Sequence, residues 1–333
     1  MAQEIVISGK QSFSLASYQD APLQQDEIRG RTMCTLISQG TELGWANGDS
    51  FPIRPGYAAV FEVQEIGADV VGVKPGDLRF AMGCHRSTQT HPVGQTLAVP
   101  AGLAPDRAVV ARLLGVTIST LMTTRARPGD PMVITGAGPV GFLAAQLFQA
   151  FGYAVTVVDP DARRRAQVVA SGIADCRAEM PLEDAALAGK VALVVDCSGH
   201  EGAVLAGCKM VRRLGEVVLV GVPWRKMTET SAHEVLSAVF FNLVTLRSGW
   251  EWQLPIKSKA FVWEELMEGY NNAPHSIMDG FRRALDWLTE GRFMLEGLFH
   301  IAEPGDPAAL YGQIARREIV EPFIVLDWCD AEG

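Results

Sequence analysis

The stretch "VITGAGPVGFLAAQL", residues 133–147, joins a run of β-branched residues to an alanine- and leucine-rich segment through three glycines. Gly136, Gly138 and Gly141 give the spacing G-x-G-x-x-G between a predicted strand and a predicted helix. The first glycine permits a tight turn, the second lets the backbone approach a pyrophosphate, and the third lets the helix pack closely on its strand. The alternative is a glycine-rich turn in some other α/β sheet.

The flanks of this turn favour a dinucleotide site. The predicted helix begins at Pro139 and Val140, and its first turn offers free N–H groups and a positive dipole to phosphates. Asp159 lies 23 residues after Gly136, at the end of "AVTVVD", where a carboxylate can accept hydrogen bonds from the adenosine ribose. Because Asp159 would repel a 2′-phosphate, the sequence predicts NAD(H) over NADP(H). The arginines at 163–165 could soften that preference, but their helical spacing favours a solvated face.

The chain changes character near residue 120. Before it, short runs such as "EIVISG", "AAVFEVQEIG" and "QTLAVPAG" alternate with turns such as "KPGD", which indicates a mainly β domain. After residue 130, the runs "YAVTVVDP", "VALVVDCSG" and "EVVLVGVP" alternate with helical segments, one of them near residues 201–213. Such continuous apolar runs predict a doubly wound parallel sheet. The tail, roughly 277–333, returns to helix plus short strand.

Composition excludes several classes of protein. The chain has 333 residues, 48% of them hydrophobic and 20% charged, which is typical of a globular protein with two domains. A net charge of −9 with scattered basic residues argues against a nucleic-acid partner. No apolar run is long enough for a membrane helix, and the N-terminus lacks the apolar core of a signal peptide. The six cysteines are far apart, so we expect free thiols in the cytoplasm.

The motifs "GAGPVG", "VVDP", "DCSG", "GEVVLVG", "KPGD" and "GYAAVFEVQEIG" together resemble the medium-chain dehydrogenase/reductase superfamily over nearly the whole chain. The resemblance implies a GroES-like catalytic domain over residues 1–120, a Rossmann NAD-binding domain over 121–275 and a return to the catalytic domain over 276–333. It also implies an active site in the cleft between the domains and a homodimer formed through the Rossmann domain. Ser198, Gly221 and Ser248 are then further cofactor-binding residues.

The same resemblance implies that this chain lacks the superfamily's zinc. Zinc-dependent members carry Cys-Gly-Thr/Ser-Asp at residues 39–42, where this chain has "QGTE", and Gly-His-Glu at residues 56–58, where it has "GYA". A third ligand would fall near Val116, and the cysteine-rich structural lobe is missing. An amide, a phenol and a valine cannot hold zinc. Cys84, His85 and His91 form the one other possible metal group in the sequence, but their spacing matches no known metal site, so we favour a structural or surface role for them.

Catalysis without zinc needs a nicotinamide and an acid or base for the hydroxyl proton. Tyr57 occupies a former ligand position, so we expect it to donate to the substrate oxygen or to act as the acid/base. The alternative is that Tyr57 and Gln39 only fill the space that zinc vacated. Thr41 matches the hydroxyl that relays protons in zinc members. Glu42 is a candidate of the same site, but we favour for it an anchoring role through hydrogen bonds.

Trp250 and Trp252 follow the run "LVTLRSG", which in the superfamily lines the nicotinamide pocket. They are candidates for walling a bulky or aromatic small-molecule substrate, although core packing or an interface explains each of them equally well. The pieces "SQGTE", "PGYAA" and "EWQ" and the "LDW" near the C-terminus are also similar to the zinc-less branch that contains bacteriochlorophyllide a dehydrogenase.

The sequence therefore predicts a zinc-independent, NAD(H)-dependent oxidoreductase that interconverts a secondary alcohol and a ketone. An enoyl or quinone reductase that acts on an activated double bond is the alternative within enzymes. A relative that binds nucleotide but has lost activity is the alternative outside them.

Overall fold

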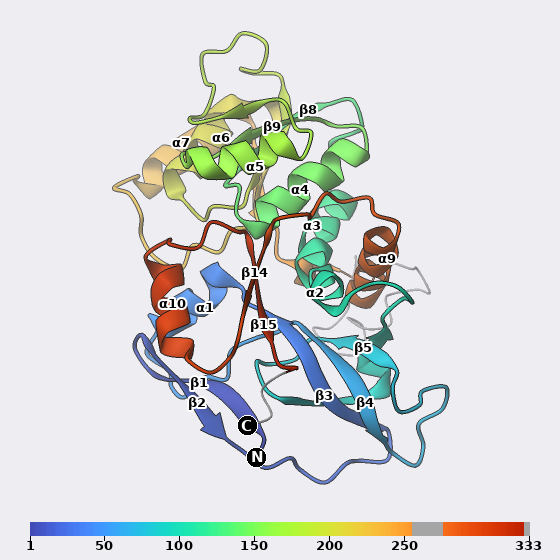
Figure 1. Ribbon diagram of the computed structural model, residues 1–333. Coiled ribbons are helices and arrows are strands. Elements are labelled where there is room, and N and C mark those ends of the chain that lie inside the picture. Colours follow the sequence, from blue (N-terminus) through green and yellow to red (C-terminus); the bar gives the residue numbers. More distant parts are fainter. Residues whose placement is uncertain (255–275, 330–333) are drawn as a thin grey trace. The chain divides into compact units, whose positions relative to one another are not determined.

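A computed structural model describes residues 1–254 and 276–329 of the chain (Figure 1). The chain divides into two compact units, which we call unit 1 (Met1–Arg112 and Phe281–Gly333) and unit 2 (Leu113–Gly280). Helices α3 (Ala111–Thr123) and α9 (Ile277–Thr289) each contain a unit boundary. Within the described residues, no helix is long and apolar enough to cross a membrane.

Unit 2 is built on a parallel sheet in the order β10-β9-β8-β11-β12-β13. This is the strand order of a doubly wound dinucleotide-binding fold, so the predicted fold class is confirmed. Its strands are β8 (Pro131–Thr135), β9 (Ala154–Val158), β10 (Cys176–Arg177), β11 (Val191–Asp196), β12 (Val211–Leu219) and β13 (Thr245–Ser248). Its other elements are α4 (Pro139–Ala150), α5 (Ala162–Ala170), α6 (Glu201–Met210), α7 (Ala232–Asn242) and η2 (Glu251–Gln253).

The apolar runs of unit 2 form the centre of this sheet. Every residue of β11 is buried, as expected for a strand covered on both faces. The helix expected over 201–213 ends earlier, at Met210, because the next residue, Val211, already pairs with Val191 of β11. Val211 is β-branched, so its pairing in the parallel ladder is favoured over a further turn of helix.

Unit 1 contains a mixed sheet in the order β14-β15-β3-β4-β5-β7, with β6 also paired to β3, and a separate β1-β2 hairpin. Its strands are β1 (Gln3–Gly9), β2 (Ser12–Ser17), β3 (Glu27–Leu36), β4 (Ala59–Ile66), β5 (Leu78–Ala81), β6 (Thr88–Pro92), β7 (Thr96–Ala98), β14 (Phe299–Ala302) and β15 (Phe323–Asp327). Its other elements are α1 (Gln39–Ala46), η1 (Val93–Gln95), α2 (Pro105–Ala108) and α10 (Pro307–Ala315).

The sheet of unit 1 joins segments from opposite ends of the sequence. Strand β15 lies between β14, to which it is parallel, and β3, to which it is antiparallel (Figure 1). Ile5, Ile37 and Trp328 belong to one buried apolar cluster, so the hairpin, the end of β3 and the segment after β15 share a core. The stretch from Ser38 to Leu43 forms the N-cap and the first turn of helix α1.

Candidate functional site

The glycine-rich turn of unit 2 has the backbone that a phosphate group needs. Gly136 has a φ of 87°, a conformation that other residues rarely adopt. A Cβ on Gly141 would lie 1.8 Å from the carbonyl oxygen of Gly136, so only glycine fits there. A Cβ on Gly138, the N-cap of α4, would meet nothing closer than 4.0 Å, so this part of the backbone can be approached. The turn therefore fits a dinucleotide pyrophosphate at the start of α4, where Pro139 and Val140 lie.

Asp159 closes this turn. One of its carboxylate oxygens accepts the N–H of Ala137 at 2.7 Å, and the other accepts the N–H of Asp161 at 2.8 Å. Only 3% of the side chain is exposed, and the main role of the carboxylate is to stabilise the turn. Each oxygen retains a second lone pair for a ribose hydroxyl. Asp159 thus has a supporting role in the turn that the sequence did not indicate, and its contact with the ribose stays a prediction.

The three arginines after Asp159 differ in their contacts. Arg163 pairs with Asp161 at 2.9 Å, and Arg165 donates to the carbonyl oxygen of Asp159 at 2.8 Å. Arg164 places a guanidinium nitrogen 3.8 Å from the Asp159 carboxylate, beside the glycine-rich turn. A cation at this point reduces the repulsion between Asp159 and a 2′-phosphate.

The other expected cofactor residues follow neighbouring parallel strands, whose carboxyl ends share one edge of the sheet. Ser198 follows β11 and donates to the Asp196 carboxylate at 2.5 Å. Gly221 follows β12, and a Cβ there would lie 2.4 Å from the nitrogen of Gly199. Ser248 ends β13, and its hydroxyl accepts the N–H of Trp250 at 3.1 Å.

Asp196 is the residue of this edge that the sequence did not single out. Its carboxylate accepts the hydroxyl of Thr135 at 2.7 Å and the N–H of Gly199 at 3.0 Å. Burial raises its pKa, and the hydrogen bonds from Ser198 and Thr135 oppose that rise. Asp196 therefore ties the end of β11 to β8 and to the following turn.

Trp250 and Trp252 come directly after β13. Their ring centroids lie 5.8 Å apart at an interplanar angle of 51°. Trp250 is 57% exposed. Their role as a wall of the substrate pocket stays a prediction.

In unit 1, Tyr57 is held by the start of α1. Its hydroxyl donates to the hydroxyl oxygen of Ser38 and is also hydrogen bonded to Thr41. The guanidinium carbon of Arg112 lies 4.5 Å from the centroid of the Tyr57 ring. Burial raises the pKa of Tyr57 above its usual value, while Arg112, Ser38 and Thr41 act to lower it. The phenol is therefore neutral at physiological pH, with two hydroxyl groups beside its oxygen.

Glu42 lies at the centre of a fully buried hydrogen-bonded group. One carboxylate oxygen accepts the N–H of Ser38 at 2.7 Å. The other lies 3.1 Å from Nε2 of His85 and accepts the hydroxyl of Tyr311. Nδ1 of His85 is 2.7 Å from the hydroxyl of Thr35. These contacts support the anchoring role for Glu42, because they connect α1 to α10 and to the loop between β5 and β6 that contains His85.

Gln39 also makes a structural contact. Its side-chain amide donates to the carbonyl oxygen of Pro322 at 3.1 Å, which joins the first residue of α1 to the residue before β15. This contact supports the alternative in which Gln39 serves structure.

The residues with metal-binding side chains do not converge. Cys84 donates its thiol to the carbonyl oxygen of Arg54 at 3.6 Å, and burial raises its pKa. His85 contacts Glu42 and Thr35, while His91 contacts Gln89 at 3.2 Å. In residues 1–254 and 276–329, no three His, Cys, Asp or Glu side chains form a group that could hold a metal ion. His275 lies outside these residues.

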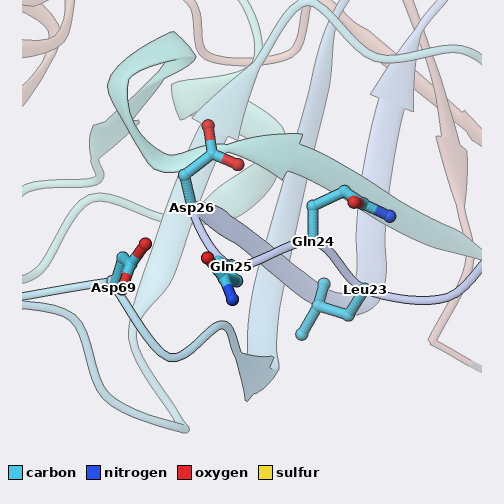
Figure 2. A pocket seen from close by; sticks show the side chains of 5 residues that line it. All are labelled: Leu23, Gln24, Gln25, Asp26 and Asp69. Carbon is cyan, nitrogen blue, oxygen red and sulfur yellow. The ribbon is translucent and has the colours of Figure 1, made fainter.

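A surface pocket of about 390 Å³ lies elsewhere in unit 1. Figure 2 shows its lining residues, Leu23, Gln24, Gln25, Asp26 and Asp69, none of which the sequence indicated as functional. The two carboxylates are the only charged groups of this lining, and nothing in the pocket identifies a ligand.

The chain is similar to known dehydrogenases. A family described as "Zinc-binding dehydrogenase" matches residues 139–250. An alcohol dehydrogenase of Geobacillus stearothermophilus is 25% identical over 83% of this chain and 96% of its own length. L-galactonate-5-dehydrogenase of Escherichia coli is 29% identical over 36% of this chain and 37% of its own. The first curated relatives are matched over only about two fifths of their length.

Solved structures give the same fold over almost the full chain. Galactitol-1-phosphate dehydrogenase from Escherichia coli has a TM-score of 0.77 at 16% identity and covers 98% of this chain and 99% of that one. Quinone oxidoreductase from Pseudomonas syringae has a TM-score of 0.77 at 17% identity, with 98% and 100% covered. At such identities the similarity establishes the fold and leaves the substrate open.

Proposed function

We propose that this chain, which is similar to zinc-binding and alcohol dehydrogenases, is a member of the medium-chain dehydrogenase/reductase superfamily and an NAD(H)-dependent oxidoreductase that interconverts a secondary alcohol and a ketone. The observation that carries the proposal is the glycine-rich turn of unit 2, whose backbone can be approached at Gly138 and which is held by Asp159, the residue that we assign to the ribose. The location of the active site in a cleft between the two domains stays a prediction.

When bound, the nicotinamide supplies or accepts a hydride at the carbinol carbon. The protein must then supply the proton for the substrate oxygen, and we assign this role to Tyr57. Its raised pKa suits an acid in the direction of ketone reduction, because the phenol still carries its proton at neutral pH. Ser38 and Thr41 stabilise the phenolate that remains and pass a new proton to it.

We further propose that the reaction needs no zinc. At the positions that correspond to zinc ligands, the side chain of Gln39 donates a hydrogen bond to a backbone carbonyl. The hydroxyl of Tyr57 is hydrogen bonded to Ser38 and Thr41. Glu42 is already surrounded by three donors. Elemental analysis after dialysis should therefore find much less than one zinc per chain, and about one zinc per chain would contradict the proposal.

The position of Arg164 favours one second candidate, an NADPH-dependent reductase of activated double bonds. Its guanidinium lies 3.8 Å from the Asp159 carboxylate, so a 2′-phosphate bound beside Asp159 would meet a cation. Structures of the same fold include a quinone oxidoreductase and a dehydrogenase bound to NADP.

Fluorescence titration with NADH and NADPH, followed by a panel of secondary alcohols, ketones, enones and quinones, separates the candidates. We expect tighter binding of NADH and turnover of alcohols and ketones. Tighter binding of NADPH with turnover of enones or quinones would favour the reductase. Binding of NADH without any turnover would indicate a relative that has lost its activity.

A further inference from the structure

Arg112 is a buried cation beside the proposed proton donor. It is the second residue of α3, and only 7% of it is exposed. Its guanidinium carbon lies 4.5 Å from the centroid of the Tyr57 ring and 5.4 Å from that of Phe281. A guanidinium keeps its charge even when buried and stacks well on aromatic faces, so this position combines a permanent positive charge with a fixed ring.

Several other groups of the described residues lie around Tyr57. Ser38 and Thr41 contact its hydroxyl from the start of α1, and Trp45 of α1 approaches its ring edge-on, with centroids 6.2 Å apart. Glu42 is the nearby negative group, and it raises the pKa of Tyr57. Because Glu42 already accepts bonds from Ser38, His85 and Tyr311, much of its charge is compensated by its own partners. Arg112 is the positive group that acts on the phenol.

We propose that Arg112 is a positioning residue for the proton transfer. It contacts the face of the Tyr57 ring, holds the ring in place and stabilises the phenolate that forms. This inference rests on the proposed function. In ketone reduction, a hydride from the reduced nicotinamide forms the new C–H bond and the carbonyl π pair moves to oxygen. The Tyr57 O–H bond breaks as its proton joins that oxygen. The tyrosine is left with one negative charge, opposite the guanidinium.

Burial and the charge of Arg112 act on Tyr57 in opposite directions. Burial alone disfavours a phenolate, because a charged oxygen loses its hydration. A fixed cation at this range favours it, and its effect is larger in the protein interior than in water. Such preorganised charge acts only when the negative charge develops, so it lowers the barrier without tightening substrate binding.

The test places 3,5-difluorotyrosine at position 57, because fluorination lowers the phenol's pKa into a range where the protein stays folded. The titration is followed by ¹⁹F NMR in the full chain. Arg112→Gln and Arg112→Met remove the charge, and we expect both to raise the pKa of residue 57. Arg112→Lys restores a charge and should return the pKa most of the way to that of the parent protein. An unchanged pKa in either folded charge-free variant would overturn the proposal.

Arg86→Gln is the matched control. Arg86 makes the same kind of contact, with its guanidinium carbon 3.9 Å from the centroid of the Tyr18 ring, in another part of unit 1. This variant should leave the titration of residue 57 unchanged, and a rise equal to that of Arg112→Gln would count against a local effect of Arg112.

Kinetics with the natural Tyr57 give a second readout. Arg112→Gln and Arg112→Met should lower kcat by about 10- to 100-fold while KM changes little. A raised KM with normal kcat would show that Arg112 binds substrate instead and would overturn the assignment. Should wild-type protein turn over no alcohol or ketone, the proposed function fails, while the ¹⁹F titration still decides whether Arg112 controls Tyr57.

Discussion

At the residue scale, the hydroxyl of Tyr57 should matter for turnover far more than for stability. Tyr57→Phe removes the proposed proton donor and keeps the ring beneath Arg112. We expect kcat to fall by about 100-fold, because the lost bond strengthens as charge grows on the substrate oxygen. Cofactor affinity and thermal stability should change little. Single-turnover hydride transfer measures the first effect, and NADH titration with thermal unfolding measures the others.

Tyr153→Phe provides the control for this variant. Tyr153 is buried in unit 2, and its hydroxyl donates to the carbonyl oxygen of Ala126 at 3.1 Å. Its loss should cost about 1 kcal/mol of stability and leave turnover unchanged. If Tyr57→Phe instead behaved like Tyr153→Phe, Tyr57 would be a packing residue only.

His91 should make the protein sensitive to acid. Burial, with a smaller effect of Arg86, lowers its pKa from 6.5 to about 4. Between these values the unfolded chain binds one more proton than the folded chain, so stability falls as the pH drops from 6.5 to 4, by up to about 1.4 kcal/mol per pH unit. His91→Gln should make this slope shallower in urea unfolding at several pH values. An unaltered slope would mean that other groups cause the acid sensitivity.

At the element scale, Glu42 should decide whether α1 stays in place. Glu42→Ala leaves the N–H of Ser38, the ring of His85 and the hydroxyl of Tyr311 buried without their acceptor. Breaking a buried charged group of this kind costs about 3–5 kcal/mol. Urea unfolding measures the loss. Glu62→Ala is the control, because its pair with Arg31 lies on the surface and contributes at most about 1 kcal/mol.

The same elements show what the sequence can predict. The turn at Gly136 to Gly141 and its partner Asp159 form within a single strand-helix-strand unit, so local spacing was sufficient to place them. The group around Glu42 could not be found in this way, because His85 is 43 residues away and Tyr311 is 269 residues away. The sequence favoured a structural role for His85, but its carboxylate partner had no signature in the sequence.

The sequence around Arg112 contains a signal of its own. It is the single charged residue in the apolar run "AVVARLLGV", and a charge within an apolar helix usually has a specific partner. Nothing in the spacing, however, indicates that this partner is Tyr57. The contact depends on the packing of the start of α3 against the loop before β4, which only the folded unit shows.

At the scale of the whole molecule, we propose a homodimer formed through unit 2. Large apolar side chains are exposed on and near α7, which monomers rarely tolerate as a cluster. They are Leu214 (74%), Leu236 (66%), Phe240 (73%), Phe241 (73%) and Leu243 (46%). Strand β13, which follows this segment, is the last in the order of the described sheet, so its edge can also pair with a second copy.

Light scattering after gel filtration tests the dimer. The wild type should have about twice the chain mass of 36.0 kDa, and the double variant Phe240→Ser with Phe241→Ser should have the mass of one chain. Val71→Ser, which changes an apolar residue of unit 1 that is 88% exposed, should stay dimeric. A monomeric wild type, or a dimer unaffected by the double variant, would contradict this interface.

The pairing of β15 with β3 has a consequence for how the protein is made. Thr35 and Trp328, which share a hydrogen bond beside this pairing, are separated by 293 residues that include all of unit 2. On the ribosome, unit 2 has left the exit tunnel before β15 exists, so unit 2 can fold while the end of β3 that pairs with β15 is still unpaired. Until then residues 34–36 of β3 expose a strand edge on the nascent chain, and this edge is where a chaperone has most to protect.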